Sequence, residues 1–301
     1  MSTAAARWSL EPGDARYPSG LTDLEPAERP ALRGLGRREL VRGLRPDDAV
    51  TIVGSRRATS YGLRVAEDLG RDLASAGVVI VSGMAIGIDG AAHRGALAAG
   101  GNTIAVLAGG ADVVYPGRHR GLHRRIVESG GAIVSEQAFG AQPRKYDFPA
   151  RNRIMAALSA VVVVVEAAEP SGTLVTANRA RDLGRDLAAI PGPVGVRAST
   201  GTNSLLKDGC HLVRHAQDVL DLLAGVGVVT LVRSGPALTP ELDRVLEAVE
   251  DGAVAPDELA RATAIDGRTA AIALARLQLL GFVARDELGG FVRTGLARAR
   301  D

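Results

Sequence analysis

Short apolar runs alternate with amphipathic segments through most of this chain, and this alternation constrains the fold more than any other feature of the sequence. The runs contain mainly Val, Ile and Ala without polar alternation, which is typical of strands buried on both faces of a sheet. They lie at residues 49–54, 78–82, 103–108, 132–135 and 160–166, with shorter candidates at 187–191 and 211–213. Segments with helical periodicity separate the runs. This alternation predicts an α/β fold with a doubly wound, mostly parallel sheet.

The composition changes along the chain indicate four parts. Residues 1–48 are rich in Pro, Gly, Ala and Arg and lack regular periodicity, so we expect an N-terminal lead-in segment there. The α/β domain is predicted over residues 49–225, and the Gly- and Val-rich stretch at 226–238 is expected to be a linker. In residues 239–301, three short helical patterns precede two apolar runs that can form a hairpin. This pattern predicts a small C-terminal winged-helix domain.

The composition excludes several classes of protein. Hydrophobic residues make up 46% of the 301 residues and charged residues 23%, which allows a sizeable core and argues against disorder over the whole length. Cys210 is the single cysteine, so no disulfide can form within the chain and a reducing cytoplasm is expected. The first residues lack the apolar core of a secretory signal, and the longest apolar run, at 154–165, is too short to cross a bilayer. We expect a soluble, cytoplasmic protein without membrane contact.

The loop after the first predicted strand contains Gly54, Ser55 and Arg56. In an open parallel sheet, ligands bind at the carboxyl ends of the strands, where loops lead into helix N-termini. Gly54 permits a close backbone approach, Ser55 offers a hydroxyl group, and the guanidinium of Arg56 suits phosphate oxygens. We predict that this turn binds phosphate. The alternative is an ordinary connecting loop whose arginines lie in solvent.

A second basic segment, at residues 144–153, combines cations with aromatic rings. Its candidate nucleic-acid-binding residues are Lys145, Phe148, Arg151, Asn152 and Arg153. Arginine and lysine can meet the phosphate backbone, while a base can stack on an aromatic ring. Because Pro149 disfavours helical geometry at the preceding residue, we expect Phe148 in a loop. The competing interpretation is that Phe148 packs into the core and that Arg151 and Arg153 form internal salt bridges.

Two further loops at the same predicted edge of the sheet are rich in glycine and hydroxyl groups. Gly83 lies in the loop that follows the second strand, and Ser171, Gly172 and Thr173 open a later helix. Such loops can hold an anion at a helix N-terminus, although a glycine pattern by itself is weak evidence. Several anion-binding loops on one sheet edge favour a polyanion or a nucleotide as the ligand.

The chemistry-bearing segments occur in a recognisable order along residues 17–224. The motifs are Tyr17-Pro18, Val53-Gly54-Ser55-Arg56, Ser82–Asp89 with Ala92-His93, Tyr115-Pro116, Ser135-Glu136, Phe148–Arg153, Ser171-Gly172-Thr173, Pro191-Gly192 and Gly201-Thr202-Asn203. This set resembles the DprA family of bacterial DNA-processing proteins, also called Smf. The tail from Leu238 looks like the winged-helix module that many members carry.

The resemblance implies an extended Rossmann-like fold that binds single-stranded DNA in a basic pocket, without catalysis and without a cofactor. It also implies self-association into a homodimer and loading of the recombinase RecA onto incoming strands during natural transformation and recombination. By the same resemblance, Arg56 binds phosphate, Lys145 contacts DNA and Phe148 faces a base.

An enzyme that acts on a nucleotide is the alternative interpretation. The same sheet edge resembles that of phosphoribohydrolases, whose Gly-Gly-X-Gly-Thr-X-X-Glu turn carries the catalytic carboxylate. Thr176 stands at that position in this chain, and a hydroxyl group cannot replace a carboxylate in that chemistry. Asp89 and His93 have no partner nucleophile and no metal-ligand spacing near them in the sequence. We therefore predict no catalytic residue, no metal site and no cofactor.

The predicted winged-helix domain is slightly acidic, with 8 arginines against 11 acidic residues over positions 239–301. Its third helical pattern, from Thr269, is rich in alanine, and Arg268 and Arg276 are its cations. A helix that reads duplex DNA normally presents more cations and more polar side chains. We expect this domain to contact protein rather than duplex DNA.

Overall fold

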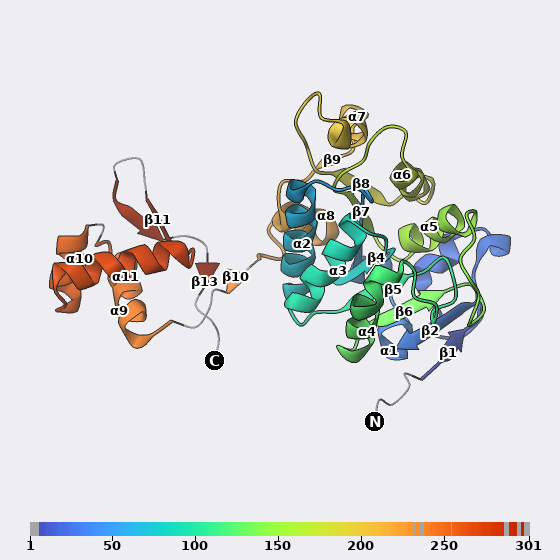
Figure 1. The fold of residues 1–301 in the computed structure, drawn as a ribbon, viewed down its shortest axis with the longest axis horizontal. Coiled ribbons are helices and arrows are strands. Elements are labelled where there is room, and N and C mark those ends of the chain that lie inside the picture. Colours follow the sequence, from blue (N-terminus) through green and yellow to red (C-terminus); the bar gives the residue numbers. More distant parts are fainter. Residues whose placement is uncertain are drawn as a thin grey trace. The chain divides into compact units, whose positions relative to one another are not determined.

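The computed structural model describes residues 6–231, 233–234, 238–253, 255–285, 289–293 and 296–297. The chain divides into two compact units, which we call unit 1 (Met1–Thr230) and unit 2 (Leu231–Asp301) (Figure 1). The expected linker at 226–238 includes residues 232 and 235–237, which lie outside the described residues. The same holds for positions 254, 286–288, 294–295 and 298–301 of the expected winged-helix domain.

Unit 1 is built on a nine-stranded sheet. In their order across the sheet, the strands are β1 (Trp8–Leu10), β2 (Leu32–Gly36), β6 (Ala132–Ser135), β5 (Thr103–Val106), β4 (Val79–Ser82), β3 (Ala49–Val53), β7 (Val161–Val164), β8 (Asp186–Ala189) and β9 (His211–Leu212). Every adjacent pair between β6 and β9 in this order is parallel, whereas β2 pairs antiparallel with both β6 and β1. The prediction of an α/β fold with a mostly parallel sheet is confirmed.

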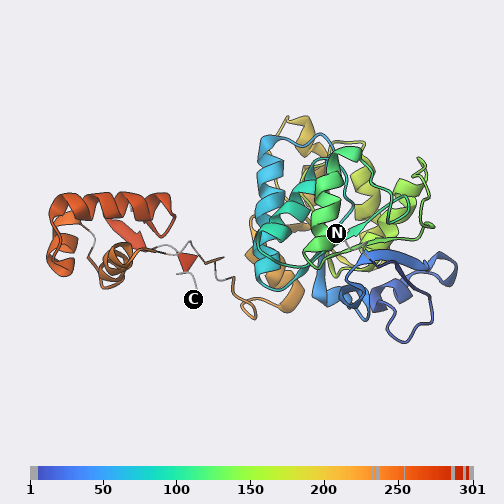
Figure 2. The ribbon, with the colours of Figure 1, turned by 60° about the horizontal axis from the view of Figure 1, so that its bottom comes forward.

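Helices cover both faces of this sheet (Figures 1 and 2). The helices of unit 1 are α1 (Arg38–Val41), α2 (Ser60–Ser75), α3 (Ile88–Ala98), α4 (Arg120–Glu128), α5 (Asp147–Ala157), α6 (Gly172–Asp182), α7 (Thr200–Lys207) and α8 (Ala216–Ala224). Helices α8, α2, α3 and α4 contact one another in that order, and α5 packs on α6. This arrangement is that of a doubly wound sheet.

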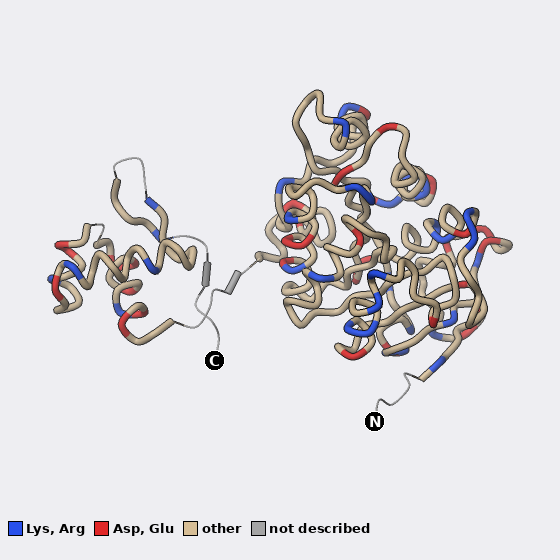
Figure 3. The backbone as a smooth tube through the Cα atoms, viewed as in Figure 1, with Lys and Arg blue, Asp and Glu red and all other residues tan. Residues whose placement is uncertain are grey.

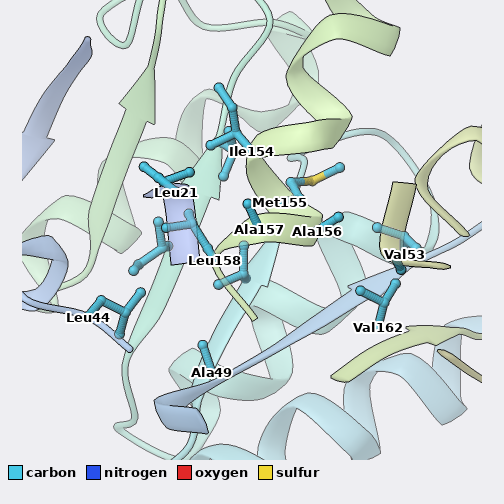
Figure 4. Packing of buried hydrophobic residues seen from close by; sticks show 14 of the residues in the cluster. Leu21, Leu44, Ala49, Val53, Ile154, Met155, Ala156, Ala157, Leu158 and Val162 are labelled. Carbon is cyan, nitrogen blue, oxygen red and sulfur yellow. The ribbon is translucent and has the colours of Figure 1, made fainter. Parts of the chain in front are cut away.

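The N-terminal segment differs from the lead-in expected at residues 1–48. Its strands β1 and β2 extend the main sheet, and β2 pairs with β6. Leu21 and Leu44 are buried in the same core cluster as Ile154, Met155 and other apolar residues of α5 (Figure 4). The segment is therefore part of unit 1. Its apolar residues are spaced across short 3-10 turns and strands, so no helical or strand period marks them in the sequence.

Helix α5 begins earlier than the sequence predicts. It spans Asp147–Ala157, so Phe148 is the second residue of a helix and the expectation of a loop at Phe148 is wrong. The N–H groups of the first helical turn have no intrahelical acceptor, so Pro149 removes no hydrogen bond at this position. The preference of the residue before proline for extended geometry is therefore overridden at the start of α5.

The residues of unit 2 that the structure describes form three helices and a hairpin, as predicted for a winged-helix domain. Its elements are β10 (Arg233–Ser234), α9 (Pro240–Glu250), α10 (Pro256–Thr263), α11 (Gly267–Leu279), β11 (Val283–Arg285), β12 (Phe291–Arg293) and β13 (Leu296–Ala297). Strands β11 and β12 pair antiparallel, and β10 pairs with β13. Val245, Leu246, Leu274 and Phe282 are fully buried in its own core cluster.

No helix within the described residues is both long and apolar enough to cross a membrane.

Candidate nucleic-acid interface

The strand order of unit 1 reverses at β3. From β3 the chain proceeds through β4 and β5 to β6 on one side, and it then returns to place β7 on the other side of β3. A crevice forms at the carboxyl ends of the strands next to such a reversal, and ligands of doubly wound proteins bind there. The loops that follow β3, β4 and β7 are the ones that sequence analysis singled out.

A groove with a volume of about 980 Å³ lies at this edge. It is lined by residues from the loop after β3, the start of α5, the start of α6 and the loop after β8. Four exposed cationic side chains line it, and no acidic partner of any of them is seen in the described part of the chain: Arg56, Arg57, Lys145 and Arg197. Asp89, which is buried, is the one carboxylate among the described lining residues. The groove is therefore cationic, in contrast to the mixed charges over much of unit 1 (Figure 3).

Arg56, Phe148 and Tyr115 form a contiguous polar and aromatic surface in this groove. The Arg56 guanidinium lies 5.0 Å from the centroid of the Phe148 ring, within the range of a cation–π interaction. The ring of Tyr115 lies 5.6 Å from that of Phe148 at an interplanar angle of 57°. Phe148 is half-buried, and Arg56 is exposed. Both predicted side chains are thus accessible, and neither is enclosed in the core.

The loop that carries Arg56 is fixed by Glu166, which follows β7. The backbone N–H of Ser55 donates to the Glu166 carbonyl at 2.7 Å. The buried Glu166 carboxylate accepts from the Thr59 N–H at 2.9 Å and from the Thr59 hydroxyl at 2.5 Å. The Ser55 hydroxyl accepts from the N–H of Arg57 at 3.0 Å. These bonds use the backbone and hydroxyl groups of the loop and leave the Arg56 side chain free to meet a ligand.

Arg151 lies beneath the groove. It is 4% exposed, and its guanidinium donates to the carbonyl of Val106 at the end of β5. Burial lowers the pKa of Arg151 to about 10, although the neighbouring Asp89 carboxylate opposes this shift. The Asp89 pKa is raised by burial, despite the nearby Arg151 charge and a hydrogen bond from the Ala85 N–H. Through its bond to Val106, Arg151 joins α5 to the end of β5, so Arg151 is a support of the groove floor.

Gly83 lies against the guanidinium of the buried Arg151. A side-chain carbon at this position would collide with the Arg151 guanidinium. Gly83 lines a smaller pocket of about 120 Å³ beside the groove. This pocket shares Arg56, Tyr115 and Phe148 with the groove and is otherwise mostly apolar.

The structure does not bring Arg153 to the groove. Its guanidinium binds both carboxylate oxygens of Glu136, at 2.9 and 2.7 Å, and the carbonyl of Glu28 at 3.1 Å. The competing interpretation, an internal salt bridge, describes the geometry of Arg153. Asn152, one residue earlier in α5, does line the groove and is 9% exposed.

Helix α6 presents its N-terminus to the groove through three of the predicted residues. The Ser171 hydroxyl caps the helix by accepting from the Thr173 N–H at 3.1 Å, and Gly172 and Thr173 form its first turn. All three residues line the groove. The free N–H groups and the helix dipole favour an anion at this end.

Arg57, Tyr115 and Arg197 also line the groove, and they were not among the site residues predicted from the sequence. Arg57 is adjacent to a predicted residue, and Tyr115 belongs to a recognised motif, so both could have been included. Arg197 begins a 3-10 turn (Arg197–Ser199) in the loop after β8, with no local pattern around it. The rule that loops after parallel strands share one edge was the signal that could have found it.

His93 is fully buried, and its Nδ1 lies 2.7 Å from the Thr103 hydroxyl. Because the Thr103 hydroxyl donates to the Ile80 carbonyl at 2.7 Å, it accepts from His93. Burial lowers the His93 pKa to about 3. Within the described residues, no cluster of three His, Cys, Asp or Glu side chains could hold a metal ion.

Comparison with known proteins identifies relatives over both units. A family model described as DNA recombination-mediator protein A matches residues 8–224, and one described as DprA winged helix domain matches residues 230–287. A putative DNA processing protein DprA of Mycobacterium tuberculosis is 42% identical over 258 residues, which cover 83% of this chain and 66% of that protein. The DNA processing protein DprA of Streptococcus pneumoniae is 44% identical over 171 residues, which cover 57% of this chain and 60% of that protein. The chain thus spans about two thirds or less of the length of these relatives.

Two solved structures are similar to most of this chain. DNA processing protein A of Streptococcus pneumoniae matches with a TM-score of 0.64 and 40% identity, over 72% of this chain and 73% of that one. DNA processing protein A of Helicobacter pylori matches with a TM-score of 0.60 and 32% identity, over 72% of this chain and 95% of that one. The latter structure was determined to describe the single-stranded DNA binding mode of that protein.

Proposed function

Because the chain belongs to the DNA recombination-mediator protein A family, whose members are also called DprA or Smf, we propose that it binds single-stranded DNA without catalysis. The cationic groove of unit 1, with an accessible ring beside an unpaired guanidinium, is the observation that carries this proposal. Phosphates need cations that have no acidic partner, and unpaired bases need an open aromatic face.

In this proposal, Arg56, Lys145 and the N-terminus of α6 bind phosphates. Gly54 and Ser55 form the turn that holds Arg56, and Ser171, Gly172 and Thr173 supply the end of the helix. A base stacks on Phe148, and the smaller apolar pocket beside it accommodates part of that base. Stacking of this kind tolerates any sequence, because every base has a π-face. Asn152 offers a polar group at the floor, whereas Gly83 and Arg151 keep the floor in shape.

Fluorescence anisotropy with an oligothymidine tests the proposal. We expect Arg56→Ala to weaken binding by roughly 1–3 kcal/mol, or about 5-fold to about 150-fold, because the variant cannot donate a charge-assisted hydrogen bond to phosphate. Arg181→Ala, which removes an exposed arginine from the last turn of α6, is the matched control. The logarithm of the affinity should fall with log salt by roughly 0.7 per phosphate neutralised. Equal affinities of Arg56→Ala and the control would contradict the role of Arg56.

A nucleotide-hydrolysing enzyme of the phosphoribohydrolase type is less well supported. Thr176, at the position of the catalytic glutamate, is 2% exposed and lines the groove. Asp89 is buried and accepts a hydrogen bond from the Ala85 N–H, and both oxygens of Glu166 accept hydrogen bonds from Thr59. Release of free base from nucleoside monophosphates by the pure protein would overturn the non-enzymatic proposal.

The family relationship supports a wider proposal for the whole protein. We propose that it forms a homodimer, loads RecA onto single strands and acts in the cytoplasm during natural transformation and recombination. Light scattering tests the homodimer, and RecA-dependent strand exchange on strands coated by a single-strand binding protein tests loading. A monomeric protein without effect on strand exchange would contradict these proposals and leave the groove proposal standing.

A further inference from the structure

The groove does not end the cationic surface of unit 1. The wall that contains Tyr115 continues through Pro116 and the 3-10 turn Gly117–His119 directly into α4. Because β5 and β6 are parallel, the helix between them starts at the carboxyl edge of the sheet, where the groove lies. From there α4 runs back towards the opposite edge.

The start of α4 is packed onto the wall of the groove. The His119 Nδ1–H donates to the carbonyl of Met84 at 2.9 Å, in the loop that follows β4. The His119 ring also lies against Gly90 in the first turn of α3, where a side-chain carbon would meet it. Met84 is 1% exposed and belongs to the core cluster that includes Leu122 of α4. The first turn of α4 therefore keeps a fixed position relative to the groove.

Four exposed arginines lie on α4 and on the 3-10 turn that precedes it, and we call them the α4 surface: Arg118, Arg120, Arg124 and Arg125. Glu128 is the one acidic residue of the helix, and it lies in the last turn, 3.8 Å from Arg124. These two side chains are 73% and 60% exposed, so their attraction is weak. No acidic partner of Arg118, Arg120 or Arg125 is seen among the residues that the structure describes.

Several other arginines of unit 1 have acidic partners, in contrast to Arg118, Arg120 and Arg125. Arg7 pairs with Asp112, Arg42 with Glu39 and Arg45 with Asp48. The buried face of α4 is formed by Leu122, His123 and Ile126, which leaves Arg120 and Arg124 one turn apart on the opposite side. Figure 3 shows Lys and Arg along this helix, which Figure 1 labels α4.

We propose that the α4 surface is a second part of the nucleic-acid site, which binds the phosphates of a single strand after it leaves the groove past Tyr115. Phosphates of the strand meet Arg118 and Arg120 first and Arg124 and Arg125 one turn later. This inference rests on the proposed binding of single-stranded DNA in the groove, and it adds a direction in which the strand continues. The guanidinium groups of Arg118, Arg120 and Arg125, which have no acidic partner among the described residues, are suited to this role, because each phosphate that they neutralise releases a counterion.

The proposal predicts an effect that depends on the length of the strand. Binding should be measured by anisotropy in the full-length protein with oligothymidines of about 4 to about 16 nucleotides, the range of site sizes known for single-strand grooves. We expect the double variant Arg118→Ala/Arg120→Ala to bind the shortest strands as the unmodified protein does. With long strands its affinity at 0.1 M salt should fall by about 5-fold for each phosphate that the variant no longer neutralises, and the salt slope by about 0.7 for each such phosphate.

The order of the arginines along α4 sharpens the test. As strands become longer, Arg118→Ala/Arg120→Ala should be the first variant to bind more weakly than the unmodified protein. Arg124→Ala should bind more weakly only when the strands are longer still. The double variant Arg181→Ala/Lys207→Ala removes two exposed charges from the ends of α6 and α7 and should change binding at no length. Melting curves of all variants should coincide, since every substituted side chain is exposed.

The possible outcomes separate this proposal from the proposed function. Unchanged affinity of Arg118→Ala/Arg120→Ala for long strands, or an equal loss at all lengths, would overturn the role of the α4 surface. Failure of the unmodified protein to bind oligothymidine of any length would instead refute single-strand binding in the groove.

Discussion

At the scale of single residues, the contacts of a cation decide whether it serves binding or stability. Lys145 and Arg153 lie in the same basic segment of the sequence, but their surroundings differ. Lys145 is exposed and lines the groove, whereas Arg153 is held by Glu136, with side chains that are 12% and 20% exposed. A partly buried pair of this kind resists exchange with a phosphate, because Glu136 would lose its partner.

We therefore predict opposite effects of two substitutions in this segment. Lys145→Ala should weaken oligothymidine binding and leave the free energy of unfolding within about 0.5 kcal/mol of the original value. Arg153→Ala should lower the free energy of unfolding by about 1.5–3 kcal/mol, since it removes hydrogen bonds to a charged group, and should leave binding unchanged. Urea unfolding and anisotropy measure the two quantities. A loss of affinity in Arg153→Ala with unchanged stability would restore Arg153 to the binding site.

His93 makes the stability of the protein depend on pH, because its side chain is buried in the core. Its pKa falls from 6.5 to about 3 in the folded state because burial disfavours the imidazolium ion. Between these values the unfolded chain binds a proton that the folded chain does not, so stability falls as the pH falls. At pH 5, about 1.5 pH units below the pKa of His93 in the unfolded chain, the loss in free energy of unfolding amounts to about 2 kcal/mol.

The comparison of the unmodified protein with His93→Gln isolates this contribution. Burial also lowers the His123 pKa, which acts in the same direction, while the raised Asp89 pKa acts in the opposite direction. We expect the loss of stability between pH 7 and pH 5, measured by urea unfolding, to be smaller in His93→Gln. Equal losses in both proteins would mean that His93 does not titrate in this range.

At the scale of elements, the connection between β7 and the start of α2 holds the turn that we propose to bind phosphate. Glu166 accepts two hydrogen bonds from Thr59, and Gly62 in the first turn of α2 leaves room for its carboxylate. We predict that Glu166→Gln lowers the free energy of unfolding by about 1.5–3 kcal/mol, because the amide has one accepting oxygen instead of two and its hydrogen bonds are no longer assisted by a charge.

The same substitution should weaken oligothymidine binding several-fold, since the loop that carries Arg56 loses its attachment to β7. Glu67→Gln, which changes a half-exposed carboxylate of α2, is the control and should affect neither property. If Glu166→Gln unfolds more easily and binds as tightly as the control, the turn keeps its shape without the carboxylate.

The elements also show which parts of the site a sequence can predict. The apolar strands and the turn with Arg56 were predictable because each rests on local pattern and on the shared edge of parallel strands. The start of α5 could not be predicted in this way. The preference of the residue before Pro149 for extended geometry is overridden there, at the first turn of a helix. Arg197 and Tyr115 approach the groove through long loops, and only the tertiary structure reveals their position. The partner of Arg153 is likewise remote in sequence, 17 residues away.

At the scale of the whole molecule, the two units have different surface chemistry. The groove and the α4 surface both belong to unit 1, whereas unit 2 includes the slightly acidic segment at 239–301. On α11, Ile272 and Leu279 are 50% and 87% exposed and lie two helical turns apart on one side. Exposed apolar side chains on the third helix favour contact with protein over contact with the edges of bases.

We therefore predict that a chain ending at Thr230 keeps the affinity of the full-length protein for oligothymidine, with the same salt slope. The truncation removes no residue of the groove, and unit 1 has its own buried core. The measurement is anisotropy on both chains at several salt concentrations, after thermal unfolding has shown that the shorter chain is folded. The Ile272→Ser/Leu279→Ser variant of the full-length protein is measured beside the truncated chain. Its affinity for oligothymidine should also equal that of the unmodified protein. If the truncated chain loses most of its affinity while this variant keeps it, unit 2 supplies a DNA contact outside the exposed side of α11, and the assignment of unit 2 to protein contact is wrong.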